Sequence, residues 1–74
     1  MRFFHEEGQP AVRAAAVVVI GKGMYVAVGK RNYPTIEFQT FDLDEAIMWK
    51  YETERERDEA FEAVMRGDRT RKVP

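Results

Sequence analysis

The sequence contains no cysteine and no serine, and it has a single histidine, His5. Without cysteine, neither a disulfide nor a thiolate-bound metal ion can stabilise the fold. Without serine or cysteine, the side chains that most often act as activated nucleophiles are missing. Nothing in the sequence places any of the four threonines beside His5. We therefore expect a protein that is not an enzyme, with no catalytic residue, no metal and no cofactor.

The sequence also lacks a long hydrophobic run. The longest apolar stretch, residues 14–20, has seven residues, whereas a membrane-spanning helix needs ~20. The first residues lack the basic-then-apolar order of a secretion signal, because Glu6, Glu7, Gly8 and Pro10 interrupt it. These features predict a cytoplasmic protein without membrane contact.

A length of 74 residues with 45% hydrophobic residues is typical of one small globular domain. The net charge is −1, but it is unevenly distributed: residues 1–36 carry +3, residues 37–62 carry −7, and residues 63–74 carry +3. An acidic centre argues against a uniformly basic nucleic-acid-binding protein. We expect a single domain over residues 1–67, followed by a basic C-terminal tail at residues 68–74.

The apolar pattern predicts a series of short strands. Residues 1–7 predict a short edge strand, and the β-branched run at residues 12–20 is typical of a strand buried on both faces. Residues 24–29 predict a further strand, while residues 35–41 and 46–51 alternate between apolar and polar side chains, as half-buried strands do. Glycine, proline and acidic residues predict turns in between, at residues 8–10, 21–23, 30–34 and 42–45.

A helix is predicted from Thr53 to Gly67. Thr53 and Glu56 have the spacing of a capping box, and Gly67 is a favourable residue after a helix C-terminus. One helical stripe follows, apolar except for its first residue, at Arg57, Ala60, Phe61, Val64 and Met65. The charged run around it is mainly the solvated face of this helix, stabilised by Arg55–Glu59 and Glu62–Arg66 pairs. A rival interpretation, one helix over residues 43–66 capped by Asp42, lacks an apolar stripe across residues 52–59.

Together these elements predict an α+β fold: an antiparallel sheet of four to five strands, a β-meander, with one C-terminal helix packed on one face. The predicted core comprises Ile36, Phe38, Ile47, Trp49, Phe61, Val64 and Met65. One helix covers one side of a sheet, yet both faces of residues 15–20 are apolar. We therefore expect the sheet to curl on itself or a partner to cover it, most simply a second copy in a homodimer.

Two sets of residues are candidates for binding a macromolecule. The charges on the helix offer an acidic surface for a protein partner, at Glu56, Glu59 and Glu62. Cations close to tyrosines offer the ingredients for stacking bases and pairing phosphates of single-stranded nucleic acid, at Lys22, Tyr25, Lys30, Arg31 and Tyr33. His5, Glu6 and Glu7 have metal-compatible side chains, but adjacent residues seldom converge on one ion, and we interpret them as the polar end of a strand.

The segment WKYETERERDEAFE at residues 49–62 resembles the final strand and helix of small uncharacterised bacterial and phage proteins built as a β-meander plus one helix. The opening MRFF and the later GQPAV are similar to their first strand and turn, so the resemblance covers about half of the chain. It implies the fold and a phage or mobile-element origin, but no activity and no binding residue. Transcription-coactivator-type single-strand binders have the same order of elements, but their basic ridge has no residue-by-residue match here.

The leading functional hypothesis is therefore a non-enzymatic small interaction protein that binds another macromolecule, in its sharper form a phage-type modulator of a host factor. The alternative is a single-stranded nucleic-acid-binding protein. An enzyme with a site shared between subunits is the third hypothesis.

Overall fold

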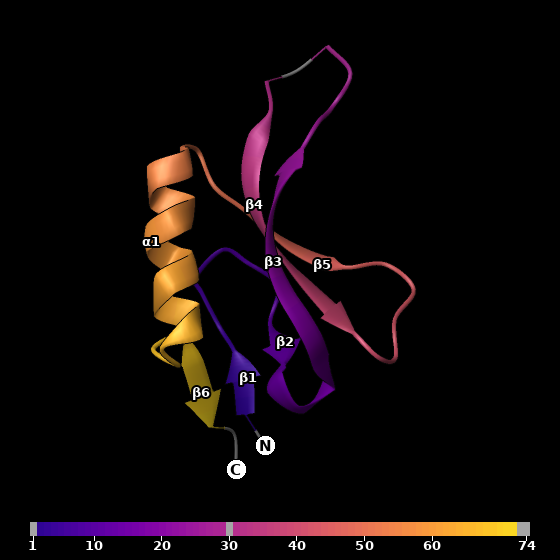
Figure 1. The fold of residues 1–74 in the computed structure, drawn as a ribbon, viewed down its shortest axis with the longest axis vertical. Helices are drawn as coiled ribbons and strands as arrows, with labels where there is room; N and C mark the ends of the chain where they lie inside the picture. The colour runs from indigo at the N-terminus through magenta and orange to yellow at the C-terminus, as the bar shows by residue number, and fades with distance from the viewer. Residues whose placement is uncertain (1, 30, 73–74) are drawn as a thin grey trace.

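The structure, a computed structural model, describes residues 2–29 and 31–72 of the chain. Its elements follow the chain in the order β1 (Arg2–Phe4), β2 (Val12–Arg13), the 3-10 helix η1 (Ala14–Ala16), β3 (Val17–Tyr25), β4 (Tyr33–Thr40), β5 (Ile47–Lys50), α1 (Glu54–Met65) and β6 (Thr70–Lys72) (Figure 1). The described strands form two antiparallel sheets of three strands, ordered β3-β4-β5 and β2-β1-β6. The α+β class is confirmed, but the larger sheet is shorter than the predicted meander of four to five strands.

The larger sheet is built around β4. Ile36 and Phe38 are buried on one face, while Glu37 and Gln39 point to the other, as the alternation predicts. β5 confirms the predicted strand at residues 46–51, and Trp49 lies opposite Ile36 in the register. The turn predicted between these strands is also present.

The prediction for residues 12–29 was wrong in three places. The run at residues 12–20 is not one strand, because η1 interrupts it and moves the chain from the small sheet to the large one. Gly21 to Gly23 do not form a hairpin turn but lie inside β3, paired with Glu37 to Thr35. The absence of a side chain at Gly23 lets the Glu37 carboxylate pack closely against the strand, since a Cβ at this position would overlap that carboxylate. The hairpin turn comes later, after Tyr25, so the strand predicted at residues 24–29 does not form.

The predicted boundaries of the helix are confirmed. Thr53 is the N-cap, and its hydroxyl accepts a hydrogen bond from Glu56 N at 3.1 Å. At the other end Gly67 adopts a φ of 83°, and Asp68 N donates to Ala63 O at 2.9 Å, which closes the last turn. The rival helix over residues 43–66 is wrong, because β5 occupies part of it.

The core lies between α1 and the larger sheet. Its most deeply buried apolar side chains are Val12, Ile36, Phe38 and Trp49, each 0% exposed, and Phe38 and Trp49 pack with ring centroids 4.6 Å apart. Of the other predicted core residues, Val64 is buried, and Ile47 and Phe61 are partly buried against the core. Met65 is 60% exposed, so its prediction was wrong: the buried side of the last turns of α1 consists of Ala60, Ala63 and Val64, and Met65 lies outside it.

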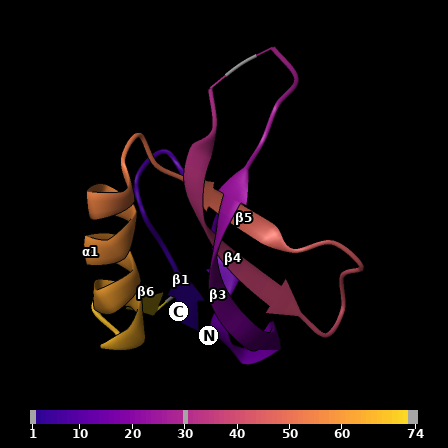
Figure 2. The same cartoon turned by 45° about the horizontal axis from the view of Figure 1, so that its top comes forward.

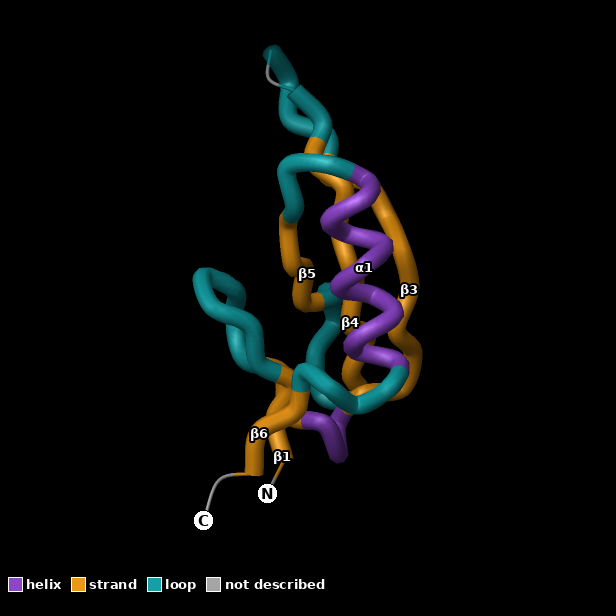
Figure 3. The backbone as a smooth tube through the Cα atoms, turned by 90° about the vertical axis from the view of Figure 1, so that its left-hand side faces the viewer, coloured by secondary structure: helices purple, strands orange, loops and turns teal. Residues whose placement is uncertain are grey.

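The small sheet brings the two ends of the chain together. β1 pairs with β6, so part of the predicted basic tail forms a strand. Phe4 packs on Phe38 with ring centroids 5.5 Å apart, which places β1 on the same side of the larger sheet as α1. Figure 2 shows α1, β1 and β6 on one side of β3 and β4, and Figure 3, viewed from that side, shows α1 lying across β4. None of the described elements forms a layer over the opposite face of the larger sheet.

Candidate functional site

The uncovered side of the larger sheet, here called the open face, carries a mixed set of side chains. They are the residues that alternate with the buried Ile36 and Phe38, together with their cross-strand partners: Val19, Tyr25, Tyr33, Thr35, Glu37, Gln39, Met48 and Lys50. All of these except Thr35 are half-buried or exposed. Val19 is 55% exposed, which is unusual for a valine on a strand of a folded domain. The helix therefore shelters one face only, as the sequence predicts.

One end of the open face carries a cluster of aromatic rings and cations. Tyr25 and Tyr33 are cross-strand partners at the end of the β3–β4 pair. Lys50 Nζ lies 4.0 Å from the centroid of the Tyr25 ring, and the Arg31 guanidinium lies 5.1 Å from that of Tyr33. Cations at such distances are attracted to the ring face. The cluster joins two tyrosines and two cations on one surface.

The structure brings together only part of the predicted nucleic-acid-binding set. Lys22 lies on the covered side of the sheet, where Nζ is 3.2 Å from Asp58 Oδ1 and 5.1 Å from the Phe61 ring. Lys30 lies outside the described residues. Lys50 was missed because it lies far from the tyrosines in sequence. Lys50 follows Trp49 in an alternating strand, so its side chain lies on the face opposite to that of Trp49. This alternation was the available signal that Lys50 shares a face of the sheet with the two tyrosines.

Arg31 is not free to turn toward a ligand without losing contacts. Its Nη2 donates to the Glu52 backbone oxygen at 2.7 Å and lies 3.0 Å from Glu52 Oε2. These contacts tie the β3–β4 loop to the segment before α1. A phosphate that binds Arg31 must compete with the Glu52 carboxylate.

The predicted protein-contact residues lie on the outward side of α1. Glu56, Glu59 and Glu62, here called the acidic stripe, are all exposed. Arg55 Nε bonds to Glu59 Oε1 at 3.3 Å, which confirms the predicted pair. The predicted Glu62–Arg66 pair is wrong, because Arg66 Nε bonds to Asp68 at 3.0 Å. Within residues 2–29 and 31–70, Glu56 and Glu62 have no ion pair, so these two positions present uncompensated negative charge.

Arg57 is the charged member of the helical stripe, and it is buried at 9% exposure. Its Nη1 donates to Gly23 O at 2.9 Å, and its Nε donates to Asp58 Oδ1 at 2.8 Å. Hydrogen bonds from Arg57 and from Lys22 hold the pKa of the Asp58 carboxyl below its usual value. The three side chains fasten α1 to β3.

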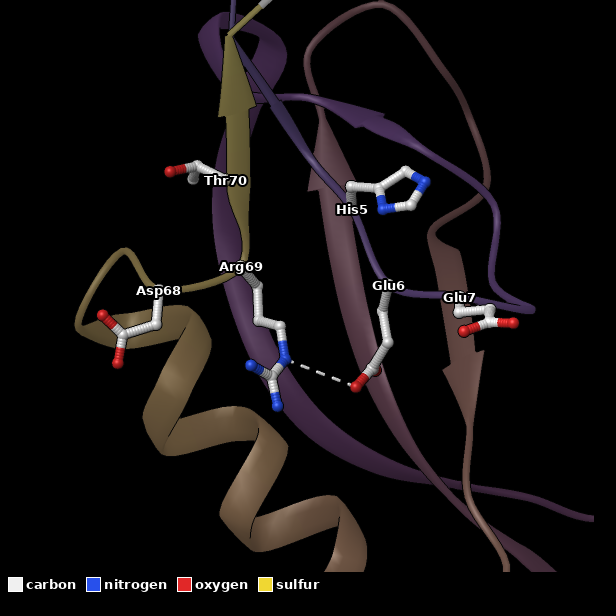
Figure 4. Close-up of a pocket in the computed structure, with 6 residues that line it drawn as sticks. All are labelled: His5, Glu6, Glu7, Asp68, Arg69 and Thr70. Carbon is white, nitrogen blue, oxygen red and sulfur yellow. Dashed lines mark ion pairs between the residues drawn. The ribbon is translucent and has the colours of Figure 1, made fainter.

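A cavity of about 300 Å³ lies where the small sheet meets the end of α1, and its lining is polar. The lining residues are His5, Glu6, Glu7, Asp68, Arg69 and Thr70 (Figure 4). Arg69 Nε lies 3.4 Å from Glu6 Oε1, while the side chains of His5 and Glu7 point away from this pair (Figure 4). The titratable groups therefore do not converge on a common point where a substrate could react.

Glu6 also accepts a hydrogen bond from the hydroxyl of Tyr51. Burial raises the pKa of Tyr51 above its usual value, and the hydrogen bond to the negative Glu6 raises it further. The Tyr51–Glu6–Arg69 contacts join β5, the N-terminal segment and the segment after α1. They are structural links between distant parts of the chain.

Comparison of the chain with protein-family models, with curated proteins and with solved structures found no match. The resemblance to small bacterial and phage proteins therefore stays a prediction. The part of the chain that the structure describes has no group of three or more histidine, cysteine, aspartate or glutamate side chains placed to hold a metal ion. Nor is any helix within it long and apolar enough to cross a membrane.

Proposed function

We propose that this protein is a non-enzymatic interaction protein that binds another macromolecule through the open face of its β3-β4-β5 sheet. The observation that carries the proposal is the position of the covering elements. α1, β1 and β6 lie on one side (Figure 2), so the second side is left to solvent or to a partner.

The composition of the open face favours a protein partner. Its wider part holds Val19, Met48 and Gln39, a mixture of apolar and neutral polar side chains typical of protein interfaces. Glu37 lies in the middle of it and would repel a phosphate backbone. Contact with protein there would bury apolar area that now faces water, at about 25 cal/mol for each Å².

The acidic stripe of Glu56, Glu59 and Glu62 is the alternative surface for such a partner. It would suit a basic protein surface, because complementary charges steer and orient association. The narrower role, a phage or mobile-element modulator of a host factor, is one form of this function and depends on the resemblance described above.

Capture from a lysate of the source cells, treated with nuclease, tests the proposal when the same experiment is run with matched variants. Gln39→Arg places a long charged side chain in the wider part of the open face, at an exposed site where little stability is lost. Charge reversal at Glu56, Glu59 and Glu62 leaves that face unchanged. We expect the captured protein to be lost with Gln39→Arg and retained with the charge reversal, with thermal midpoints close to that of the unmodified protein.

The opposite pattern, loss only upon charge reversal, would show that the acidic stripe is the contact and that the open face is not. Equal capture by the unmodified protein and both variants would refute the role of both surfaces.

A second function, binding of single-stranded nucleic acid, is favoured by one specific observation: Tyr25 and Tyr33 lie side by side with Lys50 and Arg31 over their rings. If Arg31 and Lys50 each contact one phosphate, the logarithm of the affinity should fall against the logarithm of the salt concentration with a slope of about −1.4. Fluorescence anisotropy with a labelled oligonucleotide measures it. Tyr33→Ala should weaken binding at least about fivefold through lost stacking. No binding at low salt would eliminate this function.

A further inference from the structure

Strand β3 has a free edge. Among the described residues it pairs only with β4, so the side that faces away from β4 has no strand beside it. Val18 and Met24 on this strand are 64% and 44% exposed. A long edge strand with exposed apolar side chains is a template for pairing with another chain.

The register identifies the backbone groups that this edge presents. Pro34 O accepts a hydrogen bond from Tyr51 N at 2.8 Å, so Pro34 and Ile36 direct their backbone groups to β5. Because these directions alternate along a strand, Thr35 and Glu37 direct theirs to β3. Their partners in β3 are Gly23 and Gly21. It follows that Ile20, Lys22 and Met24 turn their amide and carbonyl groups to the free edge.

The opposite edge of the sheet is partly closed. The side chain of Gln9 donates to Lys50 O at 2.7 Å and accepts from Lys50 N at 3.1 Å, taking the place of a neighbouring strand. A charged side chain on an edge strand disfavours pairing with another chain. The one such charge on β3 is Lys22, and it is neutralised because its Nζ lies 3.2 Å from Asp58 Oδ1. The sheet therefore has one edge suited to extension.

We propose that β3 pairs antiparallel with β3 of a second copy of this chain, so that the two larger sheets join into one continuous sheet in a homodimer. The two-fold axis passes beside Gly21, the middle residue of Val17–Tyr25. In this register Ile20 and Lys22 of the two copies exchange backbone hydrogen bonds, and Val19 lies opposite Gly23, beside the Glu37 side chain that packs over this glycine.

Other symmetric registers fit less well. A centre at Lys22 places the two lysines directly opposite each other, which is destabilising. With the two-fold axis at Ile20, the irregular pairing between Val17 and Val19 lies closer to the middle of the interface between the two β3 strands. The Gly21 register also leaves the open face uncovered, so the dimer does not depend on the proposed function and does not obstruct it.

A cross-link tests the register directly, because the chain has no cysteine of its own. A Cβ at Gly21 would meet no atom within 4 Å, so Gly21→Cys should fold normally. In the proposed register the two thiols face each other across a non-hydrogen-bonded pair, with Cα atoms ~4.5 Å apart, a separation that a disulfide spans. Val28→Cys is the matched control, fully exposed but beyond the end of the strand. Under mild oxidation, Gly21→Cys should cross-link at least about tenfold faster than Val28→Cys.

Sedimentation equilibrium supplies the second measurement. Gly21→Glu adds a carboxylate beside Glu37 and opposite its own copy, whereas Gly21→Gln has the same shape without the charge. We expect the dimer dissociation constant of Gly21→Glu to be at least about tenfold higher than that of Gly21→Gln, because like charges then meet at the two-fold axis.

Equal cross-linking of Gly21→Cys and Val28→Cys would overturn the proposal. So would a chain that stays monomeric up to about 1 mM, a concentration at which only ~4 kcal/mol of association is needed. A monomeric chain that still captures a protein would refute the dimer and leave the interaction function standing. A dimer that captures no protein gives the reverse result.

Discussion

Replacing Gln9 by alanine should lower the free energy of unfolding by about 1–2 kcal/mol. The amide of Gln9 makes two hydrogen bonds with the backbone of Lys50, at 2.7 and 3.1 Å, and so joins the N-terminal turn to β5. Such bonds contribute about 0.5–1.5 kcal/mol each, and these two are exposed, which places the sum in the lower half of the range. No core side chain changes, so no cavity term is added.

Gln9→Glu separates the donor from the acceptor. At pH 7 the introduced carboxylate can still accept from Lys50 N, but it faces Lys50 O without a proton to donate. We therefore expect Gln9→Glu to be at least as destabilised as Gln9→Ala at neutral pH. Because the folded state favours the neutral acid, the pKa of the introduced carboxyl is raised on folding. Stability relative to Gln9→Ala should accordingly be recovered as the pH falls below about 4, where the acid is protonated and can donate.

Urea unfolding followed by the fluorescence of Trp49, the single tryptophan and 0% exposed, measures both variants. With a slope of about 1 kcal/mol per M for a chain of this size, the midpoint of Gln9→Ala should fall by about 1–2 M. A midpoint within about 0.3 M of the unmodified protein would refute the role of Gln9. A constant difference between Gln9→Glu and Gln9→Ala from pH 7 to pH 3 would refute the proposed hydrogen-bond arrangement.

Three further variants test other contacts by the same unfolding assay. Thr53→Ala should lose about 1 kcal/mol through the missing N-cap, while Thr53→Ser, which keeps the hydroxyl, should lose a few tenths at most; equal losses would show that the hydroxyl does not cap α1. Tyr51→Phe should lower the free energy of unfolding by about 1–2 kcal/mol at pH 7. Because the pKa of Tyr51 is raised, this loss should shrink as the pH rises above ~10. A loss of stability independent of pH would contradict the raised pKa. The pKa of Asp58 is lowered, so its contribution is present above pH ~4 and disappears at more acidic pH. Asp58→Asn should therefore be less stable than the unmodified protein at pH 7 and equally stable near pH ~2.

The elements that could be predicted from the sequence are those with a local signal. The helix has a cap at Thr53, one apolar stripe and a glycine stop, and β4 has a clean alternation around Ile36 and Phe38. These signals act over a few residues, and tertiary packing reinforces them. The class of the fold follows from them without knowledge of long-range contacts.

The prediction failed where long-range pairing overrides local preference. Gly23 was interpreted as part of a turn, but its missing side chain accommodates Glu37 from the neighbouring strand. The apolar run after Val12 was expected to be one doubly buried strand. Its first residues instead belong to the small sheet, and Val18 remains exposed on the other sheet.

The candidate site shows the same limit. Tyr25, Arg31 and Tyr33 are close in sequence and were grouped correctly, whereas Lys50 joins them only through the register of the sheet. Lys22 was grouped with them by sequence distance alone. One residue of difference in strand position sends a side chain to the opposite face, and Lys22 lies on the face that α1 covers.

Solvent exposure of the two faces of the β3-β4-β5 sheet, measured by NMR with a soluble paramagnetic probe in dilute solution, is the most direct test that one face is left open for a partner. Val19 methyl groups and the Gln39 side-chain amide should be strongly broadened, while the methyl groups of Val12 and Ile36, both 0% exposed, should be broadened little. Equal protection of Val19 and Ile36 would mean that a layer covers both faces, and the proposed contact surface would then not exist.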